Sequence, residues 1–354
     1  SHKKIFEICK KHLTFVSRFC LLKCDFVVKY ITKEKILSVY REKGNCIKGY
    51  YSNFLGRFIM SVIVSIVIGY VLDMIIGTPK GLKKIKSIFI RFLKRMYKKM
   101  NGKLGVLFTL VILAAGGGIF WGIKILLNNY NMIFQIIFES IVCYFCISCK
   151  DIKENGERVH KALKRGYIKN ATKLFNTLTD NGEINEPREI AENIIIMIMD
   201  ASLDRVIAPV FYIIVFGGAG GVVYKLLVII NDAADRLFAR ILRNIADFIP
   251  ARIATLFMLM SAKILKMNCK NAFKIFKRDR YKLRSLNRGL LMSVCAGALG
   301  IELSFRKSGV TIGDKKKVTT HNDIKRTFEM VNIASLLTLV VLAAIRILIV
   351  LFVI

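Results

Sequence analysis

The sequence contains few acidic residues and few histidines, and each shortage excludes a class of site. Its 354 residues include 24 Asp and Glu against 57 Lys and Arg, which gives a formal net charge of +33. The four histidines are scattered, which argues against a histidine-built metal centre. Nucleic-acid binding would explain the positive charge, but no zinc-finger, helix-turn-helix or aromatic-basic sheet motif accompanies it. We therefore expect no nucleic-acid partner and attribute the charge to loops that lie against anionic membrane lipids.

Long stretches of the chain are apolar and nearly free of charged residues. Hydrophobic residues make up 54% of the chain and include several runs near the length of a membrane-crossing helix. The sequence predicts an all-α fold, a polytopic integral membrane helical bundle with interfacial amphipathic helices and one glycine-broken helix. The lysine-rich loops predict that the polar regions lie on the cytoplasmic side of a bacterial cytoplasmic membrane.

Five segments are predicted to cross the membrane. A basic amphipathic N-terminal extension, residues 1–54, precedes a membrane domain, residues 55–332, which contains a cytoplasmic helical region at 150–205; a C-terminal transmembrane helix follows at 333–354. The segment 80–103 lacks acids and has apolar residues at helical spacing, so we expect an amphipathic helix on the membrane surface. The five predicted spans are 58–76, 105–127, 132–148, 206–230 and 333–354.

The fourth predicted span is interrupted by glycine. Pro209 lies near its start, and the run Gly217-Gly218-Ala219-Gly220-Gly221 lies in its middle. Two half-helices that cross the membrane and a re-entrant hairpin both fit this pattern. A simple crossing would place the basic stretch 263–288 outside, against the positive-inside trend, unless 253–264 or 289–303 also crosses.

Three cysteines follow the third span as a C-x-x-C-x-x-C run, Cys143, Cys146 and Cys149. On one helix they would share a face, and iron–sulfur ligation needs a fourth thiolate close by. We expect apolar packing and no iron–sulfur cluster.

Four short motifs follow one another between Asp204 and Gly300. They are Asp204-x-x-Ile207-Ala208-Pro209-Val210-Phe211-Tyr212, Gly217-Gly218 with Tyr224-Lys225, Ile249-Pro250-Ala251-Arg252, and Ser285-x-Asn287-x-Gly289 with Ala296-Gly297-Ala298-Leu299-Gly300. Their order resembles that of the adenosylcobinamide-phosphate synthase family of cobalamin biosynthesis (CobD/CbiB), and the resemblance runs from Tyr70 to about Asn332.

The resemblance implies an integral membrane enzyme that joins the carboxylate of cobyric acid, a corrinoid, to the amine of aminopropanol phosphate. Mg²⁺ and ATP are implied as cofactors, because a carboxylate must be activated before an amine can attack it. Several acidic positions of the family motifs are replaced; an Asp-Asp pair becomes Arg243-Asn244, and a Pro-Glu pair becomes Leu291-Met292. A catalytically degenerate paralogue is therefore the alternative, a membrane scaffold that binds a corrinoid, a lipid or a protein; a transporter that uses the broken helix is a third.

Asp200, Asp204 and Asp232 are the candidate catalytic residues. Asp200 and Asp204 are four residues apart, so on a helix they could hold Mg²⁺ together, or they could cap the helix that follows. Asp232 could contact a metal ion or the amine of a substrate. The alternative is that it lies at a helix end exposed to solvent. The candidate substrate- and phosphate-binding residues are Arg252, Asn287, Gly289 and Asp247. For Arg252 an interfacial anchor is the alternative, and for Asn287 and Gly289 a plain helix start. The sequence leaves the oligomeric state open.

Overall fold

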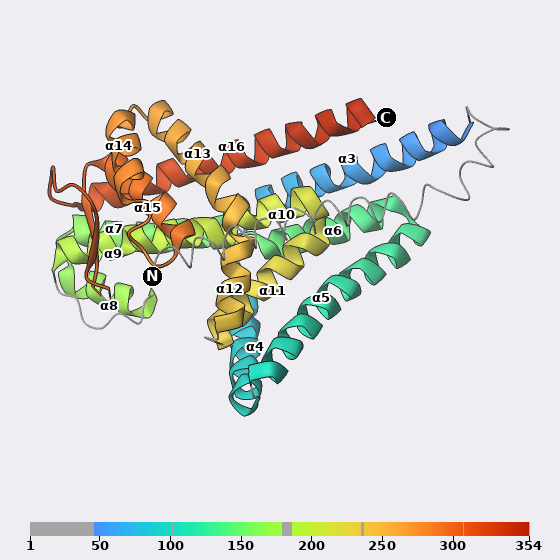
Figure 1. Ribbon diagram of the computed structural model, residues 1–354, viewed down its shortest axis with the longest axis horizontal. Helices are drawn as coiled ribbons and strands as arrows, with labels where there is room; N and C mark the ends of the chain where they lie inside the picture. The colour runs from blue at the N-terminus through green and yellow to red at the C-terminus, as the bar shows by residue number, and fades with distance from the viewer. Residues whose placement is uncertain (1–45, 101, 179–185, 235–236, 307, 354) are drawn as a thin grey trace, which may run out of the picture. The chain divides into compact units, whose positions relative to one another are not determined.

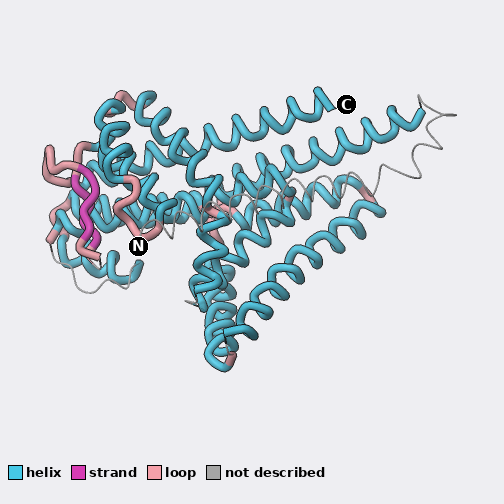
Figure 2. Tube along the Cα trace, viewed as in Figure 1, coloured by secondary structure: helices cyan, strands magenta, loops and turns pink. Residues whose placement is uncertain are grey.

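The computed structural model describes residues 46–100, 102–178, 186–234, 237–306 and 308–353. The observations below concern residues 59–353, which form one compact unit. Most of the predicted N-terminal extension therefore lies outside the described residues, although the first helix already begins at Cys46. Figure 1 labels the elements, and Figure 2 shows that helices account for nearly all of them. The all-α prediction is confirmed.

The helices end where the sequence supplies a break. Gly77 adopts a left-handed backbone with φ +72° and precedes Pro79, which separates the first two helices. Asn131 caps the fourth by accepting a hydrogen bond from the Ile133 amide at 2.9 Å. The N-terminal half of the molecule consists of α3 (Cys46–Ile75), α4 (Lys80–Lys99), α5 (Gly102–Tyr130), α6 (Met132–Cys146), α7 (Cys149–Lys164), α8 (Ile168–Leu178) and α9 (Pro187–Ser202).

A wide π-helical turn follows α9 without a break in the chain, and Gly217 then bends the backbone at φ +73°. The predicted glycine break is therefore present. The C-terminal half consists of the π turn (Leu203–Ile207), α10 (Ala208–Phe216), α11 (Gly218–Ala234), α12 (Leu237–Ala246), α13 (Phe248–Ile264), α14 (Cys269–Asp279), α15 (Leu286–Leu299), β1 (Glu302–Phe305), β2 (Val310–Gly313) and α16 (His321–Val353).

The short β-hairpin was not predicted from the sequence. β1 and β2 are antiparallel, with Leu303 opposite Ile312. Both of these side chains are fully buried, so the hairpin packs one face against the helices. Asp279 at the end of α14 accepts a hydrogen bond from the Gly313 amide at 2.9 Å, which fixes the hairpin to the bundle.

By length and apolarity, three helices of the described residues can cross a membrane, or four if the bent pair α12 and α13 counts as one span. The three are Gly102–Asn128, Met132–Lys164 and His321–Ile349. The predicted spans 105–127, 132–148 and 333–354 correspond to these three. The first predicted span, 58–76, lies in α3, a helix of 30 residues, and stays a prediction. The fourth is not one continuous helix, because the Gly217 break divides it into helices of 9 and 17 residues.

Close packing places α11 against α5. A Cβ at Gly116 would lie 2.2 Å from Leu226 Cδ1, and one at Gly117 would lie 3.1 Å from Val223 Cγ2. The glycine run of α5 therefore allows this approach, as small residues do between membrane helices. On the other side of the bundle α9 contacts α7, α15 and α16. Its Ile194, Ile195 and Ile198 are fully buried, which fixes the position of the segment that follows.

The cysteine run lies across a helix boundary. Cys146 ends α6 and Cys149 begins α7, so the three thiols do not share one continuous helix. Cys143, Cys146 and Cys149 are free and buried.

Candidate functional site

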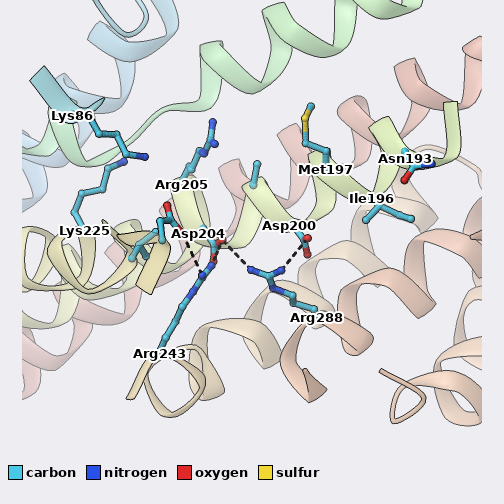
Figure 3. A pocket seen from close by; sticks show the side chains of 13 residues that line it. Lys86, Asn193, Ile196, Met197, Asp200, Asp204, Arg205, Lys225, Arg243 and Arg288 are labelled. Atoms are coloured by element: carbon cyan, nitrogen blue, oxygen red, sulfur yellow. Dashed lines mark hydrogen bonds and ion pairs between the residues drawn. The ribbon is translucent and has the colours of Figure 1, made fainter. Parts of the chain in front are cut away.

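A charged cavity of about 260 Å³ lies where α9 runs into the π turn. Side chains from α4, α9, the π turn, α11, α12 and α15 line it, and Figure 3 shows them from close by. A π turn lets one residue bulge from a helix, and such turns are frequent at functional sites. Here the turn contains Asp204 and Arg205, and both line the cavity.

The cavity brings together the three predicted catalytic aspartates, Asp200, Asp204 and Asp232. Five cations also line it, so positive charge exceeds negative charge by two. Asn193, Ile196, Met197, Ala201 and Val228 complete the lining. The five cations are Lys86, Arg205, Lys225, Arg243 and Arg288.

Arg243 is the centre of the ion-pair network. Its guanidinium donates a hydrogen bond to Asp204 Oδ2, and its Nη1 lies 3.9 Å from Asp232 Oδ1. Its Nε lies 3.6 Å from Asp247 Oδ2, and the side chain is only 7% exposed. One buried guanidinium therefore neutralises carboxylates from the π turn, α11 and the α12–α13 junction.

Arg288 links the two aspartates that the sequence pairs. Its Nη1 lies 3.2 Å from Asp200 Oδ2, and its Nη2 lies 3.7 Å from Asp204 Oδ2. Burial raises the pKa of Asp200 to about 6, and the charge of Arg288 opposes that rise. Oδ1 of Asp200 is buried and has no hydrogen-bond partner in the described part of the chain. Asp200 can therefore gain or lose a proton near neutral pH.

These carboxylates do not form a metal cage. Guanidinium groups already contact Asp200 and Asp204, and the described residues contain no group of three or more His, Cys, Asp or Glu placed to hold a metal ion. A resident metal therefore does not fit. Mg²⁺ that enters with substrate phosphates needs only one or two carboxylates, and Asp232, 42% exposed, is the least constrained of the three. The assignment of Mg²⁺ to Asp200 and Asp204 stays a prediction.

Arg252 does not line the cavity. Its Nη1 donates a hydrogen bond to the Phe248 carbonyl at 2.6 Å, and its guanidinium stacks 3.3 Å from the centre of the Phe248 ring. Arg252 is therefore not among the residues that surround the aspartates, and its role in substrate or phosphate binding stays a prediction.

Asn287, Gly289 and Asp247 do not line the cavity, but each lies next to a residue or helix that does. Asn287 Nδ2 donates to the Asn244 carbonyl at 2.7 Å, which joins the start of α15 to the end of α12. A Cβ at Gly289, in the first turn of α15, would lie 2.5 Å from the Arg280 carbonyl oxygen, so only glycine allows this close approach. Asp247 accepts a hydrogen bond from the Tyr224 hydroxyl at 2.7 Å. These contacts position Arg243 and Arg288, and direct substrate binding by the three residues stays a prediction.

Sequence reasoning missed all five cations of the cavity as site residues. Two of them lie inside the motifs that carry the family resemblance. Lys225 follows Tyr224, and Arg288 lies between Asn287 and Gly289. Their position there is a signal that could have found them. For Arg205 the signal is the preceding Asp204, whereas nothing local marks Lys86.

Comparison with known proteins agrees with the motif order. The family described as "CobD/Cbib protein" matches residues 66–233 and 237–340. Similar curated proteins are "Cobalamin biosynthesis protein CobD" of Clostridium perfringens, 32% identical over 78% of this chain and 96% of that protein, and its namesake of Clostridium tetani, 29% identical over 77% and 94%. "Cobalamin biosynthesis protein CbiB" of Salmonella typhimurium is 24% identical over 78% and 95%.

No solved structure matches the chain significantly. The family match covers well over half of the chain and includes every residue that lines the cavity. This chain is therefore a member of the CobD/CbiB family of membrane-bound cobalamin biosynthesis proteins.

Proposed function

We propose that this protein joins the carboxylate of a corrinoid, cobyric acid, to the amine of aminopropanol phosphate by forming an amide. The observation that carries the proposal is the cavity itself, which combines three carboxylates with an excess of cations in the segment that the family match covers. An amine substrate needs a proton acceptor, and phosphate groups need cations. Both kinds of group line the same space.

ATP and Mg²⁺ are the proposed co-substrates. When bound, ATP would supply the phosphoryl group that converts the corrinoid carboxylate to an acyl phosphate with release of ADP, and the amine would then displace inorganic phosphate to form the amide. The chain's own residues then have two tasks. The cations hold phosphate oxygens, and an aspartate accepts the proton that the ammonium loses.

Asp200 is the proposed proton acceptor. A general base works best when its pKa lies near the working pH, and burial raises the pKa of Asp200 to about 6. Arg288 holds Oδ2 in place at 3.2 Å, while Asp204 is bound by Arg243 and lies 3.7 Å from Arg288. We propose that Asp204 orients the two arginines and that Asp200 moves the proton.

The test is amide synthesis by the protein purified in detergent, with cobyric acid, aminopropanol phosphate, ATP and Mg²⁺. We expect product from the native protein and a loss of about 100-fold or more for Asp200→Asn and Asp204→Asn, the order of effect of removing a general base. Glu157→Gln is the matched control, since Glu157 is exposed on α7 and lies outside the cavity. It should leave the rate unchanged.

The degenerate scaffold is the alternative, and one observation favours it. Arg243 and Arg288 already pair with two of the three aspartates. Such pairs would stabilise the shape of a binding site whether or not it catalyses a reaction. Binding of a corrinoid to the purified protein with no amide formed under any nucleotide would support the scaffold and contradict the enzyme.

The rate should depend on pH through Asp200. Its raised pKa means that lowering the pH from about 7 to about 5 converts the carboxylate to the neutral acid, which cannot accept a proton. The charged groups that act on it are Arg288, Asp204 and Arg243. We expect the native rate to fall with a midpoint near 6. The residual rate of Asp200→Asn should fall only as the substrates themselves titrate, and identical profiles would contradict the assignment.

We also propose that the cavity opens toward the cytoplasm and that α4 lies on anionic lipids. Helix α4 has no acidic residue in its first turn and ends with Lys98 and Lys99. Its Ile85, Ile88 and Phe92 are exposed. Basic amphipathic helices bind anionic headgroups, and ATP would reach the cavity from the cytoplasm. Reaction of a cysteine introduced at Lys84 with an impermeant thiol reagent, in sealed vesicles of known orientation, tests the side.

A further inference from the structure

Three of the cavity's five cations form no ion pair with a carboxylate in the part of the chain that the structure describes. Arg243 and Arg288 pair with the aspartates. The other three are Lys86, Arg205 and Lys225, and Lys225 Nζ donates a hydrogen bond to the Cys146 carbonyl at 2.9 Å. The surplus positive charge of the cavity therefore lies on these three side chains.

The three unpaired cations come from three different elements and lie on the same side of the cavity. Lys86 is on α4, Arg205 on the π turn and Lys225 on α11. In Figure 3 the ends of Lys86 and Lys225 lie next to each other, and Arg205 lies between them and Met197. Burial and, to a lesser extent, the charge of Arg205 lower the pKa of Lys86, while Asp232 and Asp204 oppose that change from beyond ion-pair distance.

Like charges gathered without a counter-ion destabilise a fold unless a ligand of opposite charge binds them. We propose that Lys86, Arg205 and Lys225 form an anion subsite that binds the phosphate group of a substrate, either a phosphate monoester or the polyphosphate of a nucleotide. A guanidinium fork with two ammonium groups suits the several oxygens of phosphate. This subsite is called the cation wall below.

The cation wall would fix the orientation of a substrate in the cavity, an inference that rests on the proposed function. An amino-phosphate carries both charges, so its phosphate would bind the cation wall and its ammonium would face the carboxylate of Asp200 or Asp232. The volume of about 260 Å³ lies at the small end of ligand pockets. The size favours the small monoester over a whole nucleotide as the molecule that the cavity encloses.

Binding of inorganic phosphate, measured by calorimetry on the detergent-purified protein, tests the cation wall directly. We expect Lys86→Met and Arg205→Met each to weaken binding by about tenfold, as the loss of one charge-assisted contact does. Lys225→Met should weaken it similarly, but that variant also loses the bond to Cys146, so Lys86→Met on the surface helix α4 is decisive. Lys84→Met is the matched control, an exposed lysine two residues away.

The Michaelis constants of the amide-forming assay distinguish the two phosphate sources. A rise for aminopropanol phosphate alone in Lys86→Met assigns the wall to the monoester, and a rise for ATP alone assigns it to the polyphosphate. Phosphate binding that weakens as expected in a protein that makes no amide would overturn the proposed function and leave the subsite standing. Phosphate binding that is absent in the native protein, or equal in Lys86→Met and Lys84→Met, would overturn the subsite.

Discussion

Replacing Arg243 by methionine should abolish activity and severely destabilise the protein. The substitution leaves Asp204, Asp232 and Asp247 close together with their shared guanidinium removed. Removing one partner of a buried ion pair costs about 3–5 kcal/mol, because the remaining charge stays buried without compensation. Asp204 would also lose the contact that orients it toward Arg288. We expect amide formation to fall by more than about 100-fold, the scale of a lost preorganised charge in a catalytic site.

Two further variants separate charge from geometry at Arg243. Arg243→Lys keeps the charge, but a single ammonium cannot reach three carboxylates, so it should recover only part of the stability. Adding Asp247→Asn to Arg243→Met removes one of the uncompensated carboxylates and should restore part of the lost stability. Arg284→Met is the control, because Arg284 is exposed and does not line the cavity. Thermal unfolding in detergent reports the stabilities. A native-like melting temperature for Arg243→Met would contradict the central role of this residue.

The sequence predicts the helices of this protein well because their signals are local. Apolar runs predict α5, α6 and α16, and Gly217 predicts the break between α10 and α11 at the right residue. The β-hairpin escapes such reasoning, since each of its strands has four residues. Residues 301–305 alternate apolar and polar side chains, but only at the lower limit of length at which such alternation indicates a strand. The apolar run 206–230 is long enough for one crossing, but the break at Gly217 leaves helices of 9 and 17 residues in its place.

The residues of the cavity likewise divide into those with a local sequence signal and those without one. Asp200, Asp204 and Asp232 stand out because carboxylates are rare beside apolar segments, and the structure gathers all three. Their cationic partners are far away in the sequence: Arg243 follows Asp204 by 39 residues, and Arg288 follows Asp200 by 88. No local pattern indicates such a pair. Arg252 shows that a place inside a recognisable motif does not make a residue part of the cavity. Its guanidinium stacks on the ring of Phe248, one helical turn before it.

The second large effect is expected far from the cavity, at an ion pair inside two membrane-crossing helices. Lys124 on α5 lies 3.0 Å and 3.1 Å from the two carboxylate oxygens of Glu139 on α6, and their side chains are 7% and 0% exposed. Glu139 also accepts a hydrogen bond from the Gly218 amide at 3.1 Å. Charges in such segments are costly and remain only when they are paired. Here the carboxylate also interacts favourably with the positive N-terminal end of α11.

Because α11 carries Tyr224, Lys225 and Asp232, the Lys124–Glu139 pair fixes the start of the helix that forms one wall of the cavity. Glu139→Gln keeps an acceptor for Gly218 but removes the negative charge that both ammonium contacts of Lys124 use. Lys124→Met removes the ammonium that donates to both carboxylate oxygens of Glu139, and Arg346 remains as a cation that acts on Glu139. We expect each single variant to lose about 3–5 kcal/mol of unfolding free energy. The measurement is denaturant unfolding in detergent micelles.

The double variant Lys124→Met/Glu139→Gln shows whether the single variants lose stability because the ion pair is broken or because the side-chain packing changes. It removes both charges of the pair and leaves Arg346, which also interacts electrostatically with Glu139, as a remaining partly buried cation. It should therefore recover part of the stability that either single variant loses, as replacement of whole buried ion pairs by uncharged groups does. Losses that simply add would show that the two side chains do not interact as charges. If the pair positions α11, Glu139→Gln should retain more activity than Glu139→Leu at equal stability, because only glutamine can still accept the Gly218 hydrogen bond and hold the broken helix in register.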